Sequence, residues 1–139
     1  MSIQIAFHQE RSIPAAAILS LYNQKPNPVN RPIEDIETVL RVGGPAVGVW
    51  ANQQLIGFAR AVTDGHFRAY IEEVLVDKRY PQSSIGQKMI SYLLKGLRQV
   101  ETVHLLCSPE MFERRFDSHK NLGLWLHQQK KANDLSSPA

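Results

Sequence analysis

Cysteine is scarce in this sequence, since the 139 residues contain only Cys107. A single cysteine excludes an intrachain disulfide framework and a cysteine-rich zinc site. The five histidines are scattered without the spacing typical of metal ligands, so we expect no metal. The first residues contain no basic segment followed by an apolar one, and no apolar run reaches the roughly 18 residues that a membrane span needs. We therefore expect a cytoplasmic protein that does not associate with a membrane.

The sequence also lacks a strong excess of charge of either sign. Sixteen basic and thirteen acidic side chains give a formal net charge of +3 at pH 7. This mildly basic balance suits a small anionic ligand but does not indicate nucleic acid. A length of 139 residues with 43% hydrophobic residues favours one domain with one core. We assign this domain to residues 1–130 and expect the polar segment 131–139 to be a disordered tail.

Alternating and β-branched residues predict five strands. They are expected at 3–7, 46–51, 54–62, 69–77 and 102–107. A tight hairpin at Asn52-Gln53 and a turn at 63–67 join the three central ones. The strands at 69–77 and 102–107 flank an amphipathic helix, and such β-α-β units are parallel and right-handed.

Apolar residues at helical spacing predict the helices. One begins after Ser12, which can cap it, and a second spans 33–42 until Gly43-Gly44. A third runs from about Gln82 to Leu97, and residues 109–130 are expected to form one or two more. The predicted order is β-α-α-β-β-β-α-β-α. It implies an α/β (α+β) fold with a mixed, mostly antiparallel sheet, one parallel crossover and helices on both faces.

The stretch "VDKRYPQSSIGQKMI", residues 76–90, places a polar turn with small residues at the start of a helix. Small residues let backbone N–H groups approach an anion, and a helix N-terminus adds partial positive charge. A plain turn with serine as the helix cap is the alternative interpretation. The turn alone therefore does not decide between a phosphate site and a connector.

The turn resembles the coenzyme A motif of the GNAT N-acyltransferases, Gln/Arg-x-x-Gly-x-Gly/Ala. Gly86 matches the last glycine, while Ser84 and Pro81 stand where the motif has its first glycine and its Gln/Arg. The segment "LIGFARAVTDGHFRAYIEEVLVDKRY", residues 55–80, resembles acetyltransferases of plastids and cyanobacteria. The resemblance implies the mixed sheet predicted above and acetyl-CoA as cosubstrate.

The resemblance also implies which residues bind coenzyme A. Backbone N–H groups at the helix start would hold the pyrophosphate, with charge from Lys88 or Arg79, and the end of the preceding strand would pair with the pantetheine amides. The predicted cofactor residues are Leu75, Val76, Asp77, Gln82, Ser83, Ser84, Ile85, Gly86, Gln87 and Lys88.

Acetyl transfer to an amine needs a base, and the family often has a carboxylate near this point of the strand. Glu72 and Glu73 are the candidates. Because neighbouring strand residues point to opposite faces, only one can face the acyl group. Glu72 shares its parity with Tyr70 and is preferred, with Glu73 as the alternative. Both could instead be surface charges.

A second group could protonate the leaving thiolate. The family usually has a tyrosine just before an Asn-Leu-Gly-Phe segment, and "DSHKNLGL", residues 117–124, resembles this region with His119 in the tyrosine's place. His119 is therefore the candidate acid, because histidine titrates near neutral pH. A histidine exposed on the surface is the alternative interpretation.

The resemblance implies direct transfer of an acetyl group to a primary amine. The acceptor would be a small arylalkylamine, or the lysine or N-terminal amine of a protein, and segment 20–45 is expected to form its pocket. A catalytically degenerate acyl-CoA sensor or interaction module is the alternative function. The sheet edge near the C-terminus leaves open a homodimer, because a second copy could cover it.

Overall fold

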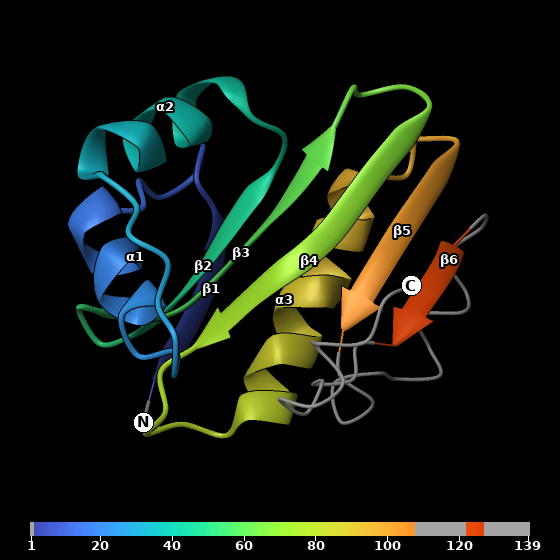
Figure 1. The fold of residues 1–139 in the computed structure, drawn as a ribbon. Coiled ribbons are helices and arrows are strands. Elements are labelled where there is room, and N and C mark those ends of the chain that lie inside the picture. The colour runs from blue at the N-terminus through green and yellow to red at the C-terminus, as the bar shows by residue number, and fades with distance from the viewer. Residues whose placement is uncertain (1, 108–121, 127–139) are drawn as a thin grey trace, which may run out of the picture.

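The computed structural model describes residues 2–107 and 122–126, which form one mixed sheet with helices on both faces (Figure 1). The elements are β1 (Ile3–Phe7), α1 (Ala15–Tyr22), α2 (Ile33–Val42), β2 (Ala46–Ala51), β3 (Gln54–Thr63), β4 (Arg68–Val76), α3 (Gln82–Gly96), β5 (Thr102–Cys107) and β6 (Leu122–Leu126). The strands predicted from alternation are confirmed with shifts of one residue at β3 and β4. Asn52 has a positive φ of 57°, as the predicted tight hairpin between β2 and β3 requires.

The sheet has the order β1-β2-β3-β4-β5-β6. The first four strands pair antiparallel, whereas β4–β5 and β5–β6 are parallel. The predicted mixed, mostly antiparallel fold is therefore confirmed, and the crossover from β4 through α3 to β5 is the predicted β-α-β unit. The second parallel pair, β5–β6, was not predicted.

The segment 122–126 was predicted within one or two helices over 109–130, and this prediction is wrong for these five residues. They form β6, in register with β5 from Val103–Leu122 to Cys107–Leu126. The sequence Leu-Gly-Leu-Trp-Leu contains a glycine that disfavours a helix, and a strand here supplies β5 with backbone partners. The remaining residues of 109–130 lie outside the described part of the chain.

The helices cover opposite faces of the sheet, with α1 and α2 on one and α3 on the other (Figure 1). The spacing predicted for α3 is confirmed, since its apolar residues Ile85, Met89, Ile90 and Leu93 are at most 2% exposed and pack on the sheet. Ile18 and Tyr22 of α1 are buried against the other face. Full burial of such side chains contributes about 1.5–3 kcal/mol each.

Each of the three helices in the described residues begins directly after a proline. Pro14, Pro32 and Pro81 are extended and make no side-chain cap. The cap predicted at Ser12 is therefore wrong, because proline disfavours helical backbone at the residue before it, Ile13, and α1 starts only at Ala15. The end of α2 at Gly43 is confirmed. No helix within 2–107 and 122–126 has both the length and the apolar character to cross a membrane.

Candidate functional site

Strands β4 and β5 separate at their C-terminal ends. Their pairing runs from Arg68–Thr102 to Ile71–Leu105 and stops there, although β4 continues to Val76 and β5 to Cys107. Figure 1 shows the two strands diverging above the start of α3. The edge of β4 that faces β5 has no strand partner after Ile71 among the described residues. Its free backbone groups can pair with an extended ligand, as an added strand would.

A β-bulge in β4 determines which of its residues face α1 and α2. The register with β3 pairs Arg60 with Glu73 and Ala61 with Ile71, so Glu72 has no counterpart. Ile71 on one side of the bulge and Val74 on the other both pack toward α3. Glu73 therefore lies on the α1–α2 face, which strict alternation would not give. The bulge breaks the two-residue parity on which the preference for Glu72 over Glu73 rested.

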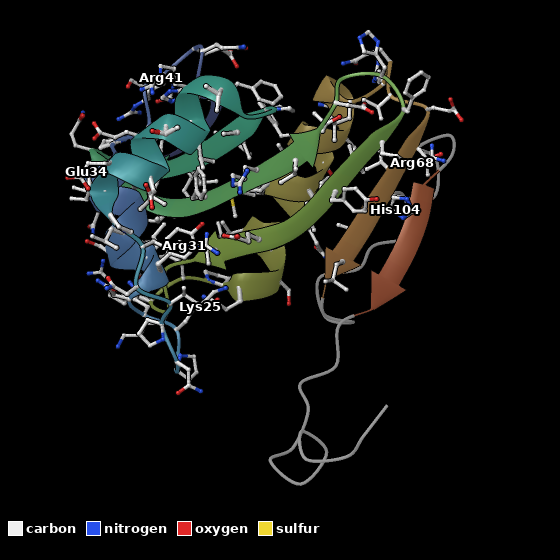
Figure 2. The ribbon with its side chains drawn as sticks, turned by 45° about the horizontal axis from the view of Figure 1, so that its top comes forward. Lys25, Arg31, Glu34, Arg41, Arg68 and His104 are labelled. Carbon is white, nitrogen blue, oxygen red and sulfur yellow. The ribbon has the colours of Figure 1, made fainter. Side chains whose placement is uncertain are left out.

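The Glu73 carboxylate is held by two side chains from distant segments. The Tyr22 hydroxyl of α1 donates a hydrogen bond to it, and Arg31 Nη1 donates at 3.0 and 3.1 Å. Arg31 also donates to the Tyr22 hydroxyl at 2.8 Å and lies over its ring. Figure 2 shows Arg31 reaching from the segment between α1 and α2 toward β4. The Glu73 side chain is 17% exposed and that of Arg31 is 36% exposed, so the carboxylate is largely shielded from water while the guanidinium remains partly accessible.

The hydrogen bonds of this network determine the protonation states of Glu73 and Tyr22. Burial alone would raise the pKa of Glu73, but the hydrogen bonds from Tyr22 and Arg31 together with the positive charge of Arg31 lower it below its ordinary value. Burial, and then the bond to Glu73, raises the pKa of Tyr22 to about 12. At neutral pH the site therefore contains a carboxylate anion beside a neutral phenol.

The first turn of α3 presents backbone donors without a side-chain cap. The first bond within the helix runs from the Ile85 N–H to the Pro81 carbonyl at 3.2 Å, so the N–H groups of Gln82, Ser83 and Ser84 have no partner inside the helix. The first turn carries no acidic residue that would offset its partial positive charge. Ser84 is exposed. This helix start is suited to an anion.

A hydrogen-bonded turn connects β4 to α3. The buried Asp77 carboxylate accepts bonds from the guanidinium of Arg79 at 2.9 and 3.0 Å, and these bonds lower the pKa of Asp77 to about 2. Gln24, just after α1, donates to Asp77 at 3.3 Å and accepts from the Lys78 N–H at 2.9 Å. Gln82 donates to the Asp77 carbonyl at 2.9 Å. The turn is thereby tied to the end of α1.

A pocket of about 280 Å³ lies beside the Glu73 network. One wall is apolar and is formed by Ile36, Val39, Leu40 and Phe58. The polar residues of the wall are Tyr22, Arg31, Asp35 and Arg60. Because Tyr22 and Arg31 bind Glu73 directly, a ligand in this pocket would lie close to that carboxylate.

Comparison with known proteins identifies the family. Residues 13–123 match the Acetyltransferase (GNAT) family. The chain belongs to this family. It is 30% identical over 89 residues to the uncharacterized N-acetyltransferase ycf52 of Pyropia yezoensis, covering 60% of this chain and 51% of that protein. It is 33% identical over 73 residues to the chloroplastic GCN5-related N-acetyltransferase 2 of Arabidopsis thaliana, covering 51% and 27%. The predicted resemblance to plastid-type acetyltransferases is confirmed.

A solved structure agrees with the fold of this GNAT chain. A putative acetyltransferase from Deinococcus radiodurans superimposes with a TM-score of 0.64 at 22% identity, covering 99% of this chain and 94% of that one. This likeness concerns the fold alone. The chain spans about half the length of the ycf52 relatives that it matches.

The predicted cofactor residues of this GNAT chain lie along one path, from the end of β4 through the turn into α3. Leu75 and Ile85 are buried core residues, so only their backbone is available to a ligand, whereas Lys88 is exposed. Arg79, the alternative source of charge, is instead paired with Asp77. Binding by these residues stays a prediction.

Of the three predicted catalytic residues, two lie in the part of the chain that the structure describes. Glu73 lies in the network beside the pocket, the backbone of Glu72 forms the bulge, and His119 lies outside the described residues. The sequence reasoning missed Tyr22, Arg31 and Arg60 as site residues. Tyr22 and Glu73 are 51 positions apart, and Arg31 and Glu73 are 42 apart. The available signal for Tyr22 and Arg31 was their location in segment 20–45, which was expected to form the acceptor pocket, whereas Arg60 on β3 had no such signal.

Proposed function

We propose that this chain binds acetyl-CoA and transfers its acetyl group directly to a primary amine. The observation that carries the proposal is the divergence of β4 and β5 after Ile71 and Leu105, next to an uncapped helix start and an ionised Glu73. Together these features give one extended ligand an anion site at one end, a strand edge along its arm and a carboxylate near its other end.

The two ends of the cofactor require different groups, and the chain offers both. The N–H groups of Gln82, Ser83 and Ser84 fit the pyrophosphate, and exposed Lys88 adds positive charge one helical turn further on. The open edge at Leu75 and Val76 fits the amides of the pantetheine arm. When bound, acetyl-CoA supplies the activated acetyl thioester. Pro81 offers no N–H, which reduces the number of donors by one.

Glu73 is the candidate base that would accept a proton from the acceptor amine. Its negative charge attracts the ammonium of an incoming amine, and its oxygens can take the proton directly or through one water molecule. Tyr22 and Arg31 keep this carboxylate ionised and fixed in position. Glu72, at the bulge one residue earlier, is the alternative base. The acceptor is a primary amine, and the family resemblance implies a small arylalkylamine, or a lysine or N-terminal amine of a protein, as the first ones to test.

A second function, an acyl-CoA sensor without turnover, is favoured by one feature. Both oxygens of Glu73 are already engaged by Tyr22 and Arg31, and their donation lowers the basicity of the carboxylate. A carboxylate held in this way could serve structure alone. The sensor would keep the strand edge and the helix start but would release no coenzyme A.

Calorimetric titration of the full chain with acetyl-CoA, followed by a thiol-release assay, tests the proposal. We expect micromolar binding of acetyl-CoA and desulfo-CoA, and weaker binding of adenosine bisphosphate, which lacks the arm that pairs with β4. We then expect thiol release that depends on an added amine, with 2-phenylethylamine and a lysine peptide as the first acceptors. Binding without amine-dependent release would favour the sensor, and absence of binding would refute both functions.

A further inference from the structure

Arg60 differs from Arg31, the other arginine of the pocket wall. Arg31 is paired with Glu73, whereas Arg60 donates no hydrogen bond and forms no ion pair with the side chains that the structure describes. Arg60 is half-buried on β3, directly opposite Glu73 in the β3–β4 register. Asp35, the acidic residue of the pocket wall, is exposed and makes no ion pair with it. The positive charge of Arg60 helps to lower the pKa of Glu73, but among the described residues its guanidinium has no hydrogen-bond acceptor.

Such a group is suited to an anion from the ligand. A half-buried guanidinium without a hydrogen-bond acceptor has lost part of its hydration, and a carboxylate restores its interactions through two parallel hydrogen bonds. Residues directly opposite on neighbouring strands have Cβ atoms about 5 Å apart, so Arg60 and Glu73 start close together on one face. One small molecule can thus place its ammonium at Glu73 and its carboxylate at Arg60.

The other residues of the pocket restrict the size and polarity of the rest of the ligand. The wall formed by Ile36, Val39, Leu40 and Phe58 is apolar, and the volume of about 280 Å³ admits a small ligand or one side chain. A polycationic acceptor would meet two arginines there and be repelled. A small ligand with an apolar body, an amine and a carboxylate can contact the apolar wall, Glu73 and Arg60 at the same time.

We propose that the acceptor of this site is a free amino acid with an apolar side chain, and that Arg60 binds its carboxylate. This inference rests on the proposed function, because it names the acceptor class of the same site. Arg60 acts on specificity, while Glu73 remains the candidate base. The amino acid would be acetylated on its α-amine, and the products would be the N-acetyl amino acid, coenzyme A and a proton.

The test compares two ligands that differ only in the carboxylate. L-phenylalanine and 2-phenylethylamine are titrated by calorimetry into protein saturated with desulfo-CoA, which cannot react. We expect phenylalanine to bind at least tenfold more tightly, and R60Q to abolish this preference. L-leucine with 3-methylbutylamine forms a second pair in case the aromatic ring does not fit. A preference for the plain amine in both pairs, or binding of neither pair, would overturn the inference.

Two variants separate specificity from stability. Arg60 Nη1 lies 3.8 Å from the position that a Cβ on Gly43 would take, so Arg60 also lies near the end of α2. R60K keeps a positive charge there but loses the planar fork, and we expect it to fold normally and to lose most of the preference. R41Q removes an exposed arginine from the last turn of α2, and Figure 2 shows Arg41 well away from Arg31. R41Q should retain the full preference.

The result is distinguishable from failure of the proposed function. If the protein releases thiol with 2-phenylethylamine but R60Q leaves the ligand preference unchanged, the chain is an acetyltransferase and the assignment of Arg60 is wrong. If phenylalanine binds through Arg60 while no amine releases thiol, the pocket assignment stands and the enzyme proposal fails.

Discussion

The two halves of the candidate site are built from different groups. The cofactor half uses mainly backbone: the unpaired edge of β4 and the first N–H groups of α3. The acceptor half uses side chains, with Tyr22, Arg31 and Glu73 brought together from α1, a connecting segment and β4. Backbone donors do not depend on side-chain identity, so we expect this half to tolerate substitutions such as Ser84 in place of the family's glycine. The acceptor half depends on the identity of each residue.

Because the two halves use different groups, substitutions in each half should have different effects. Substitutions in the acceptor half should alter turnover and specificity while acetyl-CoA still binds. Substitutions in the cofactor half should act only through charge, bulk or backbone geometry. The turn around Asp77 connects the halves, because Gln24 at the end of α1 bonds to both Asp77 and Lys78.

The largest effect is expected for Glu73→Gln in the acceptor half. Removing a general base typically costs 10²–10⁴ in rate, so we expect thiol release to fall by about 100-fold or more. Acetyl-CoA affinity by calorimetry should stay within about twofold, because the strand edge and helix start are unchanged. Glu72→Gln is the matched control and should retain most of the rate. A large loss in Glu72→Gln with little change in Glu73→Gln would exchange their roles.

Substituting the residue that connects the halves should have the next largest effect. The pKa of Asp77 falls from 3.8 to about 2 on folding, so its contribution is fully present above about pH 4 and is lost as the pH falls toward 2. We expect Asp77→Asn to lower the free energy of unfolding by about 2 kcal/mol at pH 7, measured with urea. The difference from wild type should shrink below pH 4. Glu37→Gln, an exposed change in α2, should have almost no effect.

A pH-independent loss in Asp77→Asn would contradict this account of the turn. It would mean that the carboxylate stabilises the fold by shape alone and that its charge is not involved. Binding of acetyl-CoA to Asp77→Asn then reports whether the connection matters for the cofactor half.

The same difference explains how much of the site could be predicted. The start of α3 could be read from the sequence because Pro81 to Gly86 are consecutive, and a local pattern specifies a local structure. The position of Glu73 could not, since it depends on a bulge at Glu72 that alternation does not reveal. Tyr22 was correctly placed on the helix, but its hydroxyl partner lies 51 residues away.

The fold shows a similar limit. Most helices and strands could be predicted because the spacing of apolar residues along the sequence indicates which side chains are buried. In α3 the buried residues follow the predicted spacing. The segment at Leu122–Leu126 was predicted incorrectly as helix. Four large apolar residues around one glycine are too short a run to decide between the two structures, and it is pairing with β5, a tertiary contact, that makes them a strand.

The smallest effect is expected in the cofactor half, for Ser84→Glu. A carboxylate at the first turn of α3 interacts favourably with the helix, so stability should stay equal or rise by about 0.3–1 kcal/mol. The same charge repels a pyrophosphate, and we expect acetyl-CoA affinity to fall about tenfold by calorimetry. Gln99→Glu adds an equal charge beyond the other end of α3 and should leave affinity unchanged. Tight binding in Ser84→Glu would mean that the anion lies elsewhere, and the acceptor half would then be the better-supported part of the site.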